Sequence, residues 1–119
     1  MLRVSAMTNE KDFDIQGING NSEGAAKGIE YGTELMEFAE AFARRDTSAL
    51  ATKRKLLLDA AGNDVLIDAA GVAANFQRMV RIADSTGIPY DNAETDMAQQ
   101  VSEELNLREF ASAQNTFSN

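Results

Sequence analysis

Residues 63–87 read NDVLIDAAGVAANFQRMVRIADSTG, the longest periodic segment of the chain and its most apolar one. At 3.6 residues per turn, its apolar side chains gather on one helical face with i, i+3, i+4, i+7 spacing. That face consists of Val65, Ala69, Val72, Ala73, Phe76, Met79, Val80 and Ala83. The two-residue alternation of a strand does not persist, so the segment predicts a helix packed on a core.

Both ends of this predicted helix carry residues that terminate helices. Gly62 suits the left-handed residue that closes a preceding helix, and Asn63 or Asp64 can cap the new one. Gly87 can adopt positive φ at the end, and Pro89 prevents continuation. The sequence therefore predicts a short break between this helix and the one before it.

Two more helices are expected before this segment. The first spans about 29–44, or begins as early as 25, and the second spans about 48–61 with Asp46 or Thr47 as its cap. The inward apolar positions are Tyr31, Leu35, Phe38, Ala39 and Phe42 in the first, and Leu50, Leu57, Leu58 and Ala61 in the second.

A fourth helix is expected after the central one. Asp91 and Glu94 have the spacing of a capping box at its start. Its inner face would comprise Ala93, Met97, Val101 and Leu105. Leu107 and Phe110 are expected to fold back onto the core, and residues 111–119 to be loose.

These segments predict an all-α fold, a compact bundle of about four helices. A chain of 119 residues has the length of one domain. Residues 1–24 are dense in Gly, Asn, Asp and Ser, which predicts a flexible or irregular N-terminal arm before a single helical domain over 25–119.

Charge and hydropathy restrict the partners. A formal net charge of −8 argues against nucleic acid and anionic membranes as main partners, because both favour basic surfaces. No apolar run approaches 18 residues, and the first residues lack the apolar middle of a secretion signal. We therefore expect a cytoplasmic protein.

The chain contains no cysteine and no histidine. This excludes thiol nucleophiles, zinc–thiolate sites and an intrachain Ser-His-Asp triad, so acid–base chemistry would rest on carboxylates, lysine or tyrosine. We expect no cofactor, and the absence of these groups favours a protein that is not an enzyme.

The N-terminal arm contains a partial calcium-loop pattern. Asp12, Asp14, Gln16 and Glu23 occupy positions that supply oxygen ligands in an EF-hand loop, with Gly17 at the sharp turn. Gln16 replaces the usual Asp or Asn, and no amphipathic helix precedes the pattern. A flexible acidic arm is the preferred interpretation, and a calcium site is the alternative.

The polar side of segment 63–87 supplies the candidate site residues. Asn75, Arg78, Arg81 and Asp84 lie there, and Arg81 and Asp84 have the spacing of an ion pair. A solvated face with local ion pairs is one interpretation. The alternative is a cleft or subunit interface, in which arginines would bind carboxylates in bidentate fashion.

The stretch AAGVAANFQRMVRIADSTGIPYD resembles the C-terminal region of alkylhydroperoxidase/carboxymuconolactone-decarboxylase-like proteins. The resemblance is carried by Phe76, Arg78, Arg81, Ile82, Ala83, Asp84, Gly87, Ile88 and Pro89. It covers about residues 29–116 and implies a helical, oligomeric protein. The family's peroxidase members use a Cys-x-x-Cys pair with a nearby histidine, which this chain lacks, so no catalytic residue is carried over.

Three functional hypotheses follow. We prefer a non-catalytic helical domain without thiol peroxidase activity, which self-associates as a homo-oligomer or pairs with a partner subunit. The alternative is a carboxymuconolactone-decarboxylase-like protein or enzyme that binds a small anionic ligand through Asn75, Arg78 and Arg81. The third is a calcium-modulated module.

Overall fold

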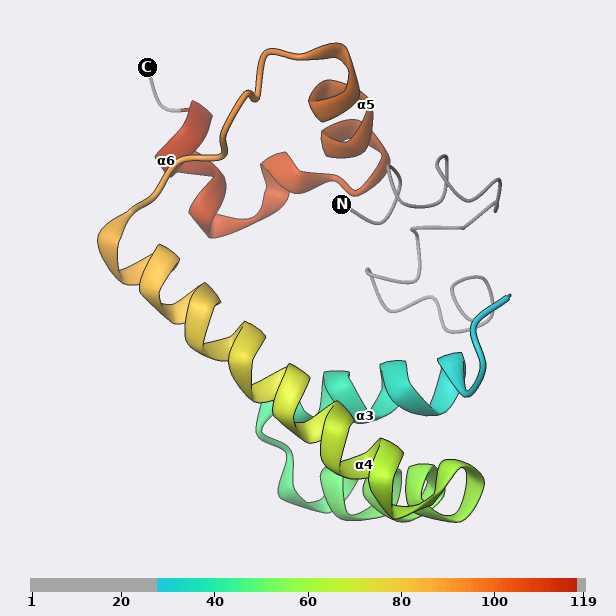
Figure 1. The fold of residues 1–119 in the computed structure, drawn as a ribbon. Helices are drawn as coiled ribbons and strands as arrows, with labels where there is room; N and C mark the ends of the chain where they lie inside the picture. The colour runs from blue at the N-terminus through green and yellow to red at the C-terminus, as the bar shows by residue number, and fades with distance from the viewer. Residues whose placement is uncertain (1–27, 118–119) are drawn as a thin grey trace. The chain divides into compact units, whose positions relative to one another are not determined.

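The computed structural model describes residues 28–117, and every regular element in that range is helical, with no strand (Figure 1). The elements are α3 (Gly32–Arg44), α4 (Thr47–Thr86), α5 (Asp96–Glu104), the 3-10 helices η2 (Leu107–Glu109) and η3 (Ala111–Ala113), and α6 (Gln114–Phe117). The predicted all-α class is confirmed. The predicted arm, with its calcium-loop pattern at Asp12, Asp14, Gln16 and Glu23, lies outside the described residues.

The contacts divide the chain into two units, Met1–Asn75 and Phe76–Asn119, with the boundary inside α4. The helix itself is unbroken through this boundary, because its one non-helical residue is Gly62. The expectation of a single helical domain over 25–119 stays a prediction.

In the first unit, α3 begins at Gly32, later than the sequence predicts, and ends at Arg44 as predicted. Left-handed backbone at Tyr31 and Arg45, with φ of 54° and 56°, marks the two ends. Phe38 and Ala41 are buried. Ala39, predicted to face inward, is exposed instead. Phe38 and Ala41 are three residues apart and share one side of the helix, and Ala39 does not lie on that side.

The first stretch of α4 begins at a strong N-terminal cap. One carboxylate oxygen of Asp46, Oδ1, accepts hydrogen bonds from the backbone N–H of Ser48 and of Ala49, both at 3.0 Å, and from the Ser48 hydroxyl at 2.8 Å. This confirms Asp46, rather than Thr47, as the capping residue. These donors lower the pKa of Asp46, the backbone N–H of Ala49 contributing most.

The same stretch contains the most deeply buried side chain among the described residues, Leu57, which has no exposed surface. Leu58, predicted to point inward beside it, is exposed. An ion pair between Lys53 Nζ and a Glu37 carboxylate oxygen, 3.0 Å apart, joins this stretch to α3. Lys55 forms a second pair within the helix, with Asp59, and lies away from α3.

Gly62 interrupts α4 between the two predicted helices. Its φ of 84° and ψ of 176° lie in a region that is essentially restricted to glycine. Positive φ is therefore confirmed, although the conformation is extended rather than the left-handed helical one that the sequence predicts. Neither Asn63 nor Asp64 caps the following stretch with its side chain in the described part of the chain.

The second stretch of α4 is helical as predicted, yet the face predicted to pack on a core is largely open. Its large side chains Val72, Phe76, Met79 and Val80 are between 48% and 60% exposed. Within residues 28–117, these four side chains therefore lack the core contacts that the sequence predicts, whereas Val65, Ala69, Ala73 and Ala83 of the same face are half-buried. Helical periodicity shows that a face is apolar, but it does not identify a neighbour that covers the face.

In the second unit, α4 ends at Thr86, and Gly87 adopts the predicted positive φ, 66°. The predicted capping box at Asp91 and Glu94 is wrong. Helix α5 starts later, and its N-cap is Thr95, whose hydroxyl oxygen accepts a hydrogen bond from Ala98 N–H at 3.4 Å. Asn92, in left-handed conformation, turns the chain before this cap.

The buried face of α5 differs from the predicted one by one residue along the chain. Ala98, Ser102 and Leu105 are buried, whereas Met97 is exposed. Small side chains at 98 and 102 permit close approach of neighbouring backbone, which explains why this side of α5 faces inward. Only Leu105 of the predicted set is buried.

Candidate functional site

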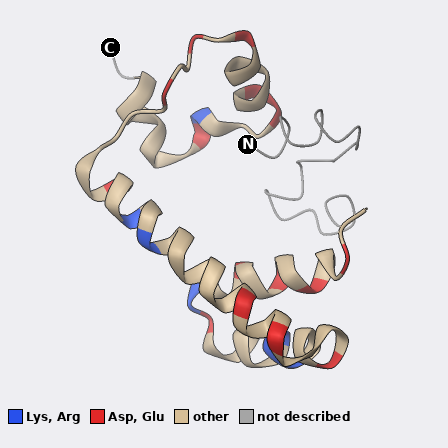
Figure 2. Ribbon diagram, in the orientation of Figure 1, with Lys and Arg blue, Asp and Glu red and all other residues tan. Residues whose placement is uncertain are grey.

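The four predicted site residues all lie on the second stretch of α4 and are exposed. At about 100° per residue, Arg78 and Arg81 lie on the side of the helix opposite Phe76. Figure 2 shows basic positions in blue along the second stretch of α4. The predicted ion pair between Arg81 and Asp84 does not form among the described residues. Asn75 and Arg78 each take part in another interaction.

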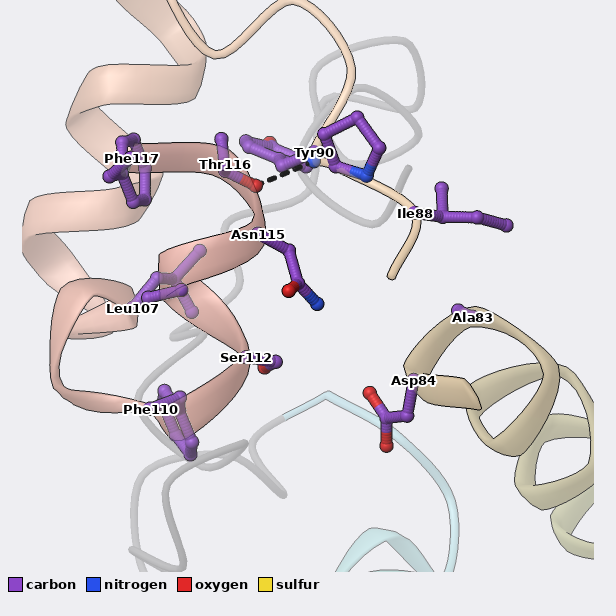
Figure 3. A pocket seen from close by; sticks show the side chains of 12 residues that line it. Ala83, Asp84, Ile88, Tyr90, Leu107, Phe110, Ser112, Asn115, Thr116 and Phe117 are labelled. Carbon is purple, nitrogen blue, oxygen red and sulfur yellow. Dashed lines mark hydrogen bonds between the residues drawn. The ribbon is translucent and has the colours of Figure 1, made fainter. Parts of the chain in front are cut away.

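An open pocket of about 440 Å³ lies within the second unit, and of the four predicted residues only Asp84 lines it (Figure 3). It is bounded by the end of α4, by residues 88–90, and by the segment that carries η2, η3 and α6. The lining residues are Ala83, Asp84, Ile88, Pro89, Tyr90, Leu107, Phe110, Ser112, Ala113, Asn115, Thr116 and Phe117.

Most of this lining is apolar, and the polar groups are few and converge. Figure 3 shows the Asp84 carboxylate, the Ser112 hydroxyl and the Asn115 amide pointing toward the same space from two sides of the pocket. Asp84 comes from α4, whereas Ser112 and Asn115 come from η3 and α6. A concave, mainly apolar surface with a few convergent polar groups is typical of small-molecule sites.

The C-terminal wall of the pocket is held by two contacts that the sequence does not reveal. The backbone N–H of Tyr90 donates a hydrogen bond to the Thr116 hydroxyl oxygen at 2.7 Å, across 26 residues of chain. The Arg108 guanidinium carbon lies 4.1 Å from the centre of the Phe117 ring, a cation–π arrangement. These contacts fix the last helical turn beside residues 88–90.

Residues 111–117 are therefore ordered helix, and the expectation that they are loose is wrong there; residues 118 and 119 lie outside the described part. Phe110 is also more exposed than expected, because it forms the rim of the pocket rather than part of a core. The seven-residue spacing of Phe110 and Phe117 is the one sequence signal that could have indicated this wall.

A second, smaller pocket of about 170 Å³ borders α5 in the same unit. Ser102 lines it, and the Ser102 hydroxyl oxygen is buried without a hydrogen-bond partner. A serine hydroxyl acts as a nucleophile only beside a base that removes its proton. No base is hydrogen-bonded to the Ser102 hydroxyl among the described residues, so we assign Ser102 no chemical role.

Two of the three glutamates of α3 are engaged in ion pairs. Glu37 pairs with Lys53, and Glu40 pairs with Arg44 at 2.8 Å. Among residues 28–117, no three carboxylates are placed to hold a metal ion together. None of the helices in this range combines the length and the apolar composition needed to cross a membrane.

No protein-family model, no curated protein and no solved structure matches this chain. The resemblance to alkylhydroperoxidase/carboxymuconolactone-decarboxylase-like proteins accordingly stays a prediction, as does the cytoplasmic location.

Proposed function

We propose that this protein is a non-catalytic helical module that self-associates through one face of the second stretch of α4. The observation that carries the proposal is the exposure of large apolar side chains on that face, among which Phe76 is 60% exposed. The absence of cysteine and histidine supports the non-catalytic part.

The exposed face has the spacing of a helix–helix seam. Successive apolar positions are separated by four, three, four, three and four residues, the alternation of four and three that is found in a coiled coil. They are Val65, Ala69, Val72, Phe76, Met79 and Ala83. We call these six residues the α4 seam, and this spacing suits another helix as the covering partner.

The side-chain sizes along the α4 seam suit a second copy of the same helix. In an antiparallel pair centred near Ala74, Val72 of one copy would face Phe76 of the other. Met79 would then face Ala69, and a large residue would oppose a smaller one on each layer. Such interdigitation is how well-packed cores avoid both voids and clashes.

The energy available to such a pairing is moderate. Full burial of a large apolar side chain contributes roughly 1.5–3 kcal/mol, and these side chains are about half exposed, so each would contribute about half of that. Association opposes this gain with the loss of translational and rotational freedom. We expect a dimer that dissociates on dilution rather than an obligate one.

The test compares two glutamate substitutions at equally exposed positions. Phe76 lies on the α4 seam, and Ile67 lies about 180° around the same helix; both side chains are 60% exposed. Light scattering coupled to size exclusion should show a dimer for wild type and Ile67→Glu, and a monomer for Phe76→Glu. A wild-type monomer at all concentrations, or equal effects of both substitutions, would refute the proposal.

A second candidate function is binding of a small anionic ligand at the arginine side of α4. It is favoured by one observation: Arg81 is exposed and makes no ion pair with Asp84 among the described residues. Arg81→Ala should then abolish binding of a dicarboxylate probe without lowering the melting temperature. An equal loss of stability would mark Arg81 as structural.

A further inference from the structure

We propose that the pocket bounded by Asp84, Ser112 and Asn115 binds a small organic cation, namely a protonated amine that carries an aromatic or branched apolar group. The pocket borders the α4 seam at Ala83, which belongs to both sets of residues, and its ligand is tested separately from self-association. Steric, polar and electrostatic features of the pocket each support this ligand.

The steric part concerns the apolar body of the ligand. The pocket volume of about 440 Å³ falls within the range of small-molecule sites. Ile88 and Pro89 contribute to one side, and Leu107, Phe110 and Phe117 contribute to the segment opposite (Figure 3). An apolar group that covers these exposed side chains removes apolar surface from water, which is favourable. These side chains offer the group no hydrogen bonds.

The polar part concerns the head group of the ligand. Asp84 is the one charged side chain among the twelve lining residues, and its carboxylate is an acceptor at neutral pH. The side chains of Ser112 and Asn115 make no hydrogen bond among the described residues, so their oxygens are available as further acceptors. An ammonium group has three N–H donors and no acceptor, which matches three oxygens that face one space.

The electrostatic part concerns the surroundings. The second unit, Phe76–Asn119, carries seven acidic and three basic residues. The acidic ones are Asp84, Asp91, Glu94, Asp96, Glu103, Glu104 and Glu109, and the basic ones are Arg78, Arg81 and Arg108. The Arg108 guanidinium lies over the Phe117 ring. A local excess of negative charge attracts cations and repels anions, so this pocket selects against the anionic ligand that the arginine side of α4 would take.

The test uses two probes of the same shape and opposite charge, 2-phenylethylamine and 3-phenylpropanoate. Each is titrated into the full-length ¹⁵N-labelled protein while backbone amide shifts are followed. The amine should cause saturable shifts at residues 83–90 and 107–117, and the carboxylate should not. Asp84→Asn should weaken amine binding by roughly tenfold, because a charge-assisted hydrogen bond is lost.

Glu94→Gln is the matched control, because it removes the same charge from the same unit at a residue that does not line the pocket. It should leave amine binding within about twofold of wild type, since exposed charges at a distance are screened. Equal weakening by both substitutions would overturn the proposal in favour of general charge attraction.

Two other outcomes would also overturn it. Amine shifts that do not saturate, or that fall outside the pocket residues, would mean that there is no site. Stronger binding of the carboxylate than of the amine, with shifts centred on Arg81 and unchanged in Asp84→Asn, would instead support the anionic-ligand candidate. None of these outcomes alters the subunit count, so failure here is distinguishable from failure of the self-association proposal.

Discussion

The two stretches of α4, on either side of Gly62, carry similar apolar periodicity and have opposite exposure. Leu57 in the first stretch has no exposed surface, whereas Phe76 in the second is 60% exposed. The first stretch is tied to α3 by the Lys53–Glu37 ion pair. The second presents its apolar side to solvent within this chain.

The difference shows that amphipathicity and burial are separate properties of a helix. A repeated apolar position predicts that a helix will bury that side against something, because exposed apolar surface is unfavourable. It does not say whether the covering element comes from the same chain. In the first stretch the chain covers the face itself, and on the α4 seam we propose that a second copy does so.

The largest expected effect separates the two stretches directly. Leu57→Ala should lower the free energy of unfolding by about 2–5 kcal/mol, because it leaves a cavity at a fully buried site. Phe76→Ala should change it by no more than about 0.5 kcal/mol in dilute protein, because the side chain is mostly exposed. Urea denaturation of both variants at low micromolar concentration measures the two values.

Protein concentration sharpens this comparison. If the α4 seam pairs with a second copy, the destabilisation by Phe76→Ala should grow as concentration rises, whereas that of Leu57→Ala should not, because association stabilises only the folded state that pairs. A large loss for Phe76→Ala that is independent of concentration would show that this side chain is covered within the monomer.

The next effect concerns the joint between the stretches. Gly62→Ala should destabilise the protein by about 1–3 kcal/mol, because the φ and ψ of Gly62 are strained for any side chain. An added Cβ at Gly62 would meet no atom within 4 Å, so the loss would come from the backbone alone. Thermal or urea denaturation measures it.

Gly71 is the matched control, since it lies in the regular helix of the second stretch and an added Cβ there also meets nothing within 4 Å. Gly71→Ala should stabilise the protein by roughly 0.8–1 kcal/mol through helix propensity. A gain from both substitutions would show that α4 runs straight through position 62.

The same contrast explains what the sequence could predict. The end of α3 at Arg44, the break at Gly62 and the stop at Gly87 follow from local chemistry, and the structure has them. The starts of α3 and α5 do not follow, since both helices begin later than the sequence predicts. The exposure of Phe76 could not be predicted, because it depends on which elements of the chain reach that face.

The pocket does not follow from the sequence for a related reason. Local periodicity places Asp84 on α4, but Ser112 and Asn115 join it through the hydrogen bond of Tyr90 to Thr116 and the stacking of Arg108 on the Phe117 ring. The hydrogen bond between Tyr90 and Thr116 joins residues 26 positions apart, and no local pattern encodes a contact over that distance in the chain.

The smallest expected effect concerns the carboxylates at the starts of the two stretches, Asp46 in the first and Asp64 in the second. The Asp46 carboxylate accepts three hydrogen bonds at the start of the first stretch, and these lower its pKa in the folded protein. A lowered folded-state pKa stabilises the protein above the unfolded-state pKa, near 4, and this contribution is lost as the pH falls through the folded-state pKa. Asp46→Asn keeps a cap but cannot titrate.

The melting temperature of Asp46→Asn should therefore lie below that of wild type at pH 7, and the gap should close as the pH falls below about 4. Asp64→Asn removes the same charge at the start of the second stretch and leaves the Asp46 cap intact, so it should retain the acid-sensitive contribution of Asp46. Melting curves at several pH values, recorded by circular dichroism, measure both. A gap for Asp46→Asn that does not narrow at all as the pH is lowered from 7 through the acid range would mean that the cap acts through its shape rather than its charge.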